Sequence, residues 1–160
     1  MNQTYSVPKI RVRADVLLPG RISAKLTLFL SDRAEHHEGH ERPSDLLNGA
    51  LAFIPAMNEL EEVVLLGHDN LMVVSVSAGD EFSDAAQQSS AAAPFDVTCH
   101  SIKIVLLDGT TLSGEVSYLM PESQRRLQDY LNNGERFLSL REAGIVHLVN
   151  KLQIVQISRS

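Results

Sequence analysis

One short segment of the chain concentrates residues that can bind a metal. Every residue except glycine in Glu35-His36-His37-Glu38-Gly39-His40-Glu41 is a histidine or a glutamate. Imidazole nitrogens and carboxylate oxygens are ligands for zinc, nickel and copper. The segment does not match the H-E-x-x-H motif, because only two residues separate His37 from His40, and Gly39 disfavours a helix. The sequence therefore offers His36, His37 and His40 as a metal site, with a solvent-exposed loop as the simpler alternative.

Two charged groups are candidates for interaction with a partner. Glu35, Glu38 and Glu41 make the same segment acidic, and an acidic surface steers a basic partner toward itself. Arg125 and Arg126 form a basic pair, and guanidinium groups bind phosphate through two parallel hydrogen bonds. The alternative for these arginines is surface pairing with neighbouring carboxylates, which contributes little stability.

Motifs for catalysis and nucleotide binding are missing from the sequence. Cys99 and His100 are adjacent, so in a strand their side chains point to opposite faces and cannot act as a nucleophile and its base. Ser113 is not in a G-x-S-x-G motif, and no phosphate-binding G-x-x-x-x-G-K-[ST] occurs. The isolated histidines His68, His100 and His147 are expected to be structural. We therefore expect neither an enzyme nor a bound cofactor.

Composition and charge narrow the class of protein and its partners. The chain has 160 residues, 44% of them hydrophobic and 21% charged, which is typical of a globular protein. Its net charge of −6 argues against a nucleic-acid partner, since such proteins carry basic surfaces. No apolar run approaches the ~18 residues of a membrane span. A single cysteine, Cys99, and the absence of a signal-like N-terminus indicate a cytoplasmic protein.

Alternating apolar residues predict β-hairpins near the start of each half of the chain. Apolar and polar residues alternate over 10–18 and 22–30, with Pro19-Gly20 between them, and again over 102–107 and 112–118, with Asp108-Gly109 as the turn. A short helix is expected after each hairpin, near 43–48 and 126–132. Further strands are expected at 51–57, 63–66 and 71–76, and at 137–140, 145–149 and 152–157.

This order of elements occurs twice, which predicts a tandem duplication. We expect a mainly β (α+β) fold built from two β-β-α-β-β units that pack together as a pseudo-dimer. The predicted domains are residues 1–77 and 95–160, joined by a flexible Ala/Ser/Gln-rich linker over 78–94. In size and pattern each unit resembles small SH3-like or Sm-like barrels, a resemblance of architecture that carries over no functional residues.

These observations favour a non-enzymatic protein–protein interaction or regulatory module of a bacterial-type cytoplasmic protein. The closing strands are apolar on both faces, so we expect them to form core between the two units, and free sheet edges would allow a partner to add a strand. The expected partner is another protein, with a homo-oligomer as one form of that interaction. The alternative is a ligand sensor that binds a metal at His36, His37 and His40 or a phosphate-bearing ligand near Arg125 and Arg126.

Overall fold

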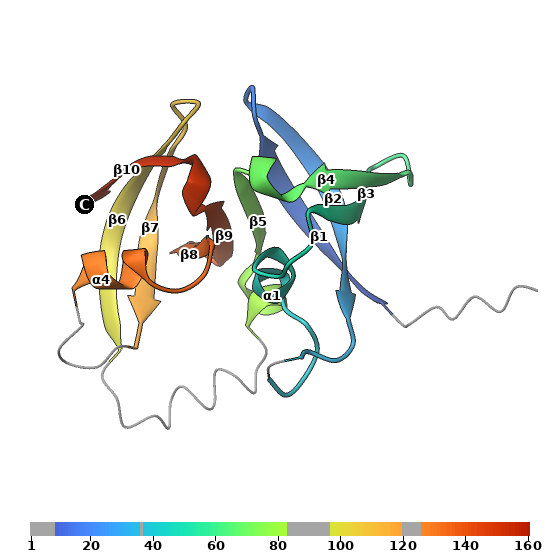
Figure 1. Ribbon diagram of the computed structural model, residues 1–160, viewed down its shortest axis with the longest axis horizontal. Helices are drawn as coiled ribbons and strands as arrows, with labels where there is room; N and C mark the ends of the chain where they lie inside the picture. The colour runs from blue at the N-terminus through green and yellow to red at the C-terminus, as the bar shows by residue number, and fades with distance from the viewer. Residues whose placement is uncertain (1–8, 36, 83–96, 120–125) are drawn as a thin grey trace, which may run out of the picture.

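A computed structural model describes residues 9–35, 37–82, 97–119 and 126–160, arranged as Figure 1 shows. Ten strands of these residues form one antiparallel sheet with the order β10-β6-β7-β8-β9-β5-β1-β2-β3-β4. The predicted mainly β class is therefore confirmed. The strands are β1 (Lys9–Leu18), β2 (Ile22–Ser31), β3 (Phe53–Met57), β4 (Val63–Gly67), β5 (Val73–Ser77), β6 (Thr98–Leu106), β7 (Thr111–Tyr118), β8 (Phe137–Glu142), β9 (Ile145–Asn150) and β10 (Ile154–Arg159).

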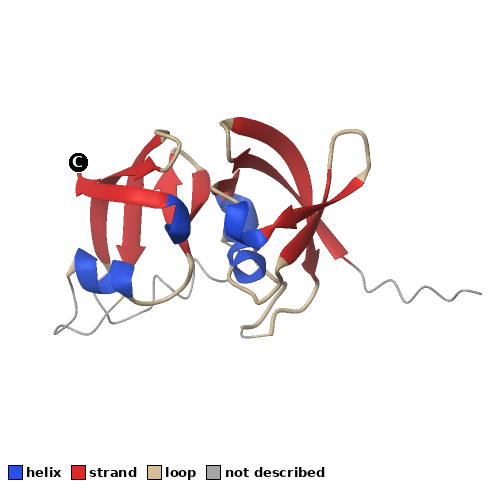
Figure 2. Cartoon of the chain, turned by 45° about the horizontal axis from the view of Figure 1, so that its top comes forward, coloured by secondary structure: helices blue, strands red, loops and turns tan. Residues whose placement is uncertain are grey.

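Short helices and turns join these strands, and Figure 2 shows them against the sheet. The helices α1 (Pro43–Leu47) and α4 (Leu127–Asn132) follow the first hairpin of each half, and α2 (Ala78–Glu81) follows β5. The 3-10 turns η1 (His68–Asn70) and η3 (Lys151–Gln153) precede β5 and β10. Each half thus runs strand, strand, helix, strand, strand, 3-10 turn, strand. The apolar segments expected to close each half are strands β4 and β5, on either side of η1, and strands β9 and β10, on either side of η3.

The alternating pattern of β1 and β2 sets the face that each side chain presents. Val12, Ala14 and Val16 are buried, whereas the intervening Arg13 and Asp15 are exposed. The hairpin between these strands turns at Gly20 and Arg21, which both have positive φ. Asp108-Gly109 forms the matching turn between β6 and β7, so both hairpins lie where the sequence predicts them.

Strand β5 lies at the centre of the sheet and joins the two halves. It pairs with β1 on one side and with β9 on the other, where the register runs from Val73 opposite Val149 to Ser77 opposite Ile145. We call the β5–β9 pairing and its surroundings the junction. The sheet thus runs through both predicted domains without a break.

The two hydrophobic cores exchange residues across the junction. The core of the first half includes Phe137, Val146 and Leu148 from β8 and β9. The core of the second half includes Met72 and Val73 from the first half. Because successive side chains of a strand point to opposite faces, β5 supplies Val73 to one core and its neighbour Val74 to the other. The apolar closing strand of the first half is therefore core, as the sequence predicts.

Helices α1 and α2 are joined through a buried carboxylate. Glu81 is 3% exposed, and its side chain accepts hydrogen bonds from the backbone N–H and the hydroxyl of Ser44. Burial raises the pKa of Glu81 above its ordinary value, and the bonds from Ser44 partly oppose that change. Residues 78–81 of the predicted linker are therefore helical and packed, whereas 83–94 lie outside the described residues.

Helix α4 packs on the second half through one apolar face. Leu127 is buried, and Tyr130 and Leu131 pack against the same core. The Tyr130 ring stacks on Tyr118, with ring centroids 4.3 Å apart. The predicted i, i+3, i+4 face is therefore the one that contacts the core.

The sheet does not close, because the strand order ends at β4 on one side and at β10 on the other. The small barrels expected from the sequence are thus not confirmed. In Figure 1, β10 lies at the left of the molecule and the β3–β4 hairpin extends to the right. Within the described residues, no helix has the length and apolar character needed to cross a membrane.

Candidate functional site

The outer face of the β3–β4 hairpin carries exposed apolar side chains. Phe53, Val63 and Leu65 are 61%, 66% and 67% exposed. They share a face because Phe53 is opposite Gly67, and Val63 and Leu65 are opposite Met57 and Pro55. We call Phe53, Val63 and Leu65 the hairpin patch. A cluster of exposed apolar residues on one face is characteristic of an interaction surface.

The hairpin patch adjoins an unpaired sheet edge. Among the described strands, β4 pairs only with β3, and at the opposite end of the sheet β10 pairs only with β6. An edge strand presents backbone N–H and C=O groups that another strand can bind. Val155 of β10 is also exposed, at 61%. Both free edges thus combine unpaired backbone with exposed apolar side chains.

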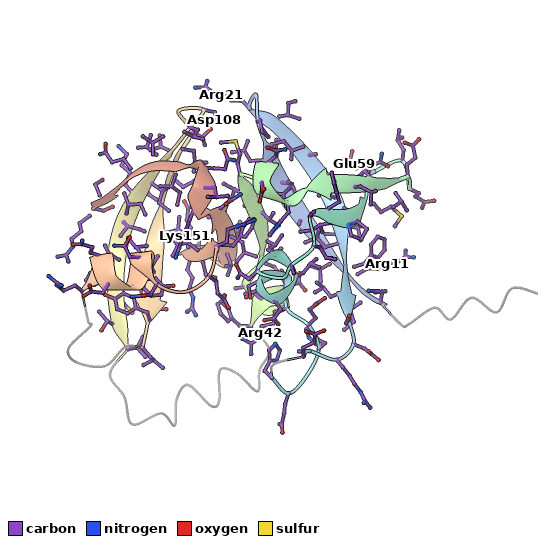
Figure 3. All side chains as sticks on the ribbon, viewed as in Figure 1. Arg11, Arg21, Arg42, Glu59, Asp108 and Lys151 are labelled. Atoms are coloured by element: carbon purple, nitrogen blue, oxygen red, sulfur yellow. The ribbon has the colours of Figure 1, made fainter. Side chains whose placement is uncertain are left out.

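The charges near the two edges differ in sign. Exposed Glu59, Glu61 and Glu62 lie in the turn between β3 and β4, and Figure 3 labels Glu59 beside that hairpin. The other edge strand ends in the exposed Arg159. The acidic character of this part of the chain therefore lies at one edge of the sheet and a basic side chain at the other.

The histidine and glutamate segment is held against helix α1. His37 Nε2 lies 2.5 Å from Asp45 Oδ2, and His37 Nδ1 donates to Glu38 O at 2.9 Å. The hydrogen bond that the His37 ring donates to the Asp45 carboxylate is the main cause that raises the pKa of His37. Asp45 also accepts the backbone N–H of Arg42 and so begins helix α1. In the described conformation both ring nitrogens of His37 have protein partners.

The remaining residues of this segment have separate surroundings. His40 Nδ1 is hydrogen-bonded to Glu41 O, and Glu41 Oε1 accepts the Ser31 N–H. His36 lies outside the described residues, so the three-histidine metal site stays a prediction. The described residues contain no group of three His, Cys, Asp or Glu side chains that could hold a metal ion. Glu35 and Glu38, predicted to meet a basic partner, lie in the same loop.

The predicted basic pair is only partly described. Arg125 lies outside the described residues, and Arg126 Nε donates to Asp129 Oδ2 at 3.1 Å. The Arg126 side chain is 78% exposed, so this ion pair adds little stability. A phosphate-bearing ligand at Arg125 and Arg126 therefore stays a prediction.

The structure links a serine, a histidine and a carboxylate that sequence reasoning did not bring together. Ser75 Oγ and His147 Nδ1 are hydrogen-bonded at 2.6 Å across the junction, and His147 Nε2 lies 3.0 Å from Glu142 Oε2. Ser75 also lines a groove of about 600 Å³ together with Arg13 and Lys25. The sequence hides this contact because Ser75 and His147 belong to different halves.

This serine, histidine and glutamate chain has the connectivity of an activated nucleophile, but its setting favours a structural role. Acyl transfer also needs N–H donors aimed at the developing oxyanion. Ser75 lies in the middle of the sheet, opposite Asp15 on one side and His147 on the other. The backbone around the hydroxyl is thus used in strand pairing. We interpret the contact as part of the junction.

The other two isolated histidines also have structural contacts. His68 is buried, donates through Nε2 to Leu47 O, and accepts through Nδ1 from Arg136 at 3.1 Å. Its ring stacks on Phe137 across the junction. His100 Nε2 is hydrogen-bonded to the Tyr118 hydroxyl at 3.1 Å.

Two more polar contacts hold the halves together. Arg21 donates to Asp108 O at 3.1 Å, so the two hairpin turns meet, as Figure 3 shows at the top of the view. The buried Asn150 donates to Leu71 O at 2.8 Å and to Asp69 O at 3.1 Å. These bonds satisfy backbone carbonyls where the two cores meet.

Comparisons with protein-family models, with curated proteins and with solved structures gave no match to this chain. The geometry of the described residues is therefore the basis for the function proposed below.

Proposed function

We propose that this protein is a non-enzymatic protein–protein interaction or regulatory module that binds its partner through a free sheet edge. The observation that carries the proposal is the hairpin patch, where three large apolar side chains are more than half exposed beside the outer edge of β4, which pairs with no other described strand than β3. Strand addition to such an edge supplies backbone hydrogen bonds, and the apolar side chains supply buried area.

We also propose that the two halves are copies of one ancestral unit. The support is the order of the described elements, which is the same from β1 to β5 and from β6 to β10. The strand registers support it as well, because β5 pairs back to β1 and β10 pairs back to β6 in the same antiparallel sense. As proposed compartment we name the cytoplasm, since Cys99 is the only cysteine and no disulfide within the chain can form.

The test of the interaction function is affinity capture from native lysate with three forms of the chain. The wild type is compared with Leu65→Glu, which places a charge on the hairpin patch, and with Leu60→Glu, a matched control. Leu60 is 77% exposed in the neighbouring turn and lies outside the patch. We expect wild type and Leu60→Glu to capture similar amounts of a partner. Leu65→Glu is expected to capture at least tenfold less of it.

A form that lacks Glu35–Glu41 separates the two predicted surfaces. Loss of the partner only on this deletion would move the interaction to the histidine and glutamate loop. Equal retention by every form would contradict binding at either surface.

A further inference from the structure

The junction inside the chain shows how two sheet edges of this protein fit together. It joins β5, the fifth strand of the first half, to β9, the fourth strand of the second half. Among the described strands, the two edges without a partner are β4, the fourth strand of the first half, and β10, the fifth strand of the second half. The junction therefore pairs a fifth strand with a fourth strand, and the two free edges are likewise one fourth strand and one fifth strand.

Strand registers define which residues of the two halves correspond. Phe53 is opposite Gly67, the last residue before η1, and Phe137 is opposite Asn150, the last residue before η3. Counting back from the 3-10 turns gives the other corresponding residues of the two fourth strands, β4 and β9. Val63 corresponds to Val146, and Leu65 corresponds to Leu148.

The fifth strands correspond in the same way. Val74 of β5 is opposite Val16 in the first half, and Ile157 of β10 is opposite Ile104 in the second. Val16 and Ile104 both lie just before the hairpin turn of their half and are fully buried. Counting from Val74 and Ile157 makes Val155 the counterpart of Met72.

The hairpin patch consists of the exposed counterparts of residues that the junction buries. Phe137, Val146 and Leu148 insert into the core of the first half and are at most 4% exposed. Met72 inserts into the core of the second half and is 1% exposed, whereas its counterpart Val155 is 61% exposed. Apolar residues that one half buries at the junction thus have apolar counterparts that remain in solvent.

The second half also offers the place where these side chains would fit. In the first half, Phe137 belongs to the same core as Leu47 of α1 and Val74 of β5, and its N–H donates to Asn48 Oδ1 at 2.8 Å. The corresponding position in the second half, between α4 and β10, is an open hollow of about 410 Å³. It is lined by Leu127, Gln128, Leu131, Asn132, Ile157 and Arg159.

We propose that the hairpin patch of one copy of this chain docks into the α4–β10 hollow of a second copy, with β4 of one paired antiparallel to β10 of the other. This inference names the partner of the proposed interaction function and rests on it. The junction register places Leu65 opposite Ile157 and Val63 opposite Arg159.

This contact uses a different surface on each copy, so it is head-to-tail and leaves one edge free at each end. Such an interface repeats until the copies close into a ring or extend as a filament. The charge at the edges does not prevent it, because the acidic turn lies on the β4 side and Arg159 on the β10 side.

The experiment measures the mass of the purified full chain by light scattering over a concentration series. Wild type and Leu60→Glu are expected to form species at multiples of 17.6 kDa, and Leu65→Glu and Val155→Glu are each expected to stay at 17.6 kDa. Each variant buries a charge at the contact but leaves the opposite edge intact. An equal mixture of the two variants should therefore give a species of twice 17.6 kDa and nothing larger.

Three outcomes would overturn the proposal. They are a monomeric wild type up to its solubility limit, an oligomer that neither variant changes, and a variant mixture that stays monomeric. Thermal unfolding of each variant at low concentration shows whether it is folded.

A disulfide test checks the register without a charged variant. In a Cys99→Ser background, Leu65→Cys with Ile157→Cys should give chains linked to one another on oxidation. Leu65→Cys with Gln156→Cys, shifted by one residue, should give at least tenfold less linked product. Equal products from both pairs would overturn the register.

These results separate the inference from the function on which it rests. A monomeric pure protein that still captures a Leu65-dependent partner from lysate would contradict self-association and leave the interaction function standing. Failure of both experiments would contradict both.

Discussion

At the scale of single residues, Asp45 performs two tasks. Its carboxylate begins helix α1 by accepting the Arg42 N–H, and it also binds the His37 ring. The carboxylate that holds the imidazole is thus the same one that caps the start of helix α1. The histidine and glutamate loop is therefore anchored to the helix through a contact that depends on protonation of His37.

We predict that Asp45→Asn lowers the pKa of His37 toward its ordinary value. In the wild type this pKa is raised above 6.5, mainly by the Asp45 hydrogen bond. A raised pKa means that the contact stabilises the fold fully below the unfolded pKa and loses that contribution as pH rises through the folded pKa. An NMR titration of the His37 ring measures the change, with Asp32→Asn as control. An unchanged His37 titration in Asp45→Asn would show that another group raises the pKa.

At the scale of elements, the close approach of β7 to β8 depends on a residue without a side chain. Gly114 lies beside β8, and a Cβ built at this position would be 2.5 Å from Arg141 O and 2.8 Å from Leu140 Cγ. The pairing of the two strands is short, with Glu115 opposite Arg141. The packing of β8 on β7 therefore requires glycine at residue 114.

We predict that Gly114→Ala lowers the free energy of unfolding by about 1–3 kcal/mol, because β8 must move away from the added methyl group. Urea unfolding measures the change. Gly79→Ala is the matched control, since its Cβ would come no closer than 4.0 Å to Ser77 Oγ. A Gly114→Ala variant as stable as the wild type would mean that β8 moves without cost.

At the scale of the whole molecule, the two halves are joined by shared cores. Phe137 belongs to the second half in sequence and to the first half in packing. Its counterpart Phe53 has the same residue type and a matching place in its strand, but it is 61% exposed. Comparing Phe53 with Phe137 therefore separates the stability that comes from burial at the junction from any effect of the residue type itself.

We predict that Phe137→Ala costs about 3–5 kcal/mol of unfolding free energy, the range for a buried phenylalanine. Phe53→Ala, measured at a concentration where the chain is monomeric, should change stability by less than about 0.5 kcal/mol, as exposed sites do. Thermal unfolding of both variants provides the comparison. A similar loss for both would contradict the unequal burial on which the proposed self-association rests.

The sequence was sufficient for the local elements and insufficient for their assembly. The alternation around Pro19-Gly20 and Asp108-Gly109 predicted both hairpins, because the period of two and the turn residues act over a few neighbours. It could not predict that β5 pairs with β9, since that contact joins residues about 70 positions apart and depends on packing. For the same reason the Ser75–His147 contact was missed. The hairpin patch was missed because the sequence of an apolar strand is the same whether its side chains are buried or exposed.

The shared core has a consequence for how the chain is made. Synthesis delivers the first half before the second, yet the core of the first half includes Phe137, Val146 and Leu148. Until residue 148 has left the ribosome, that core is incomplete and the β9-facing edge of β5 has no partner. During this interval the growing chain presents two open edges in its first half, at β4 and at β5, and is most exposed to pairing with the wrong strand.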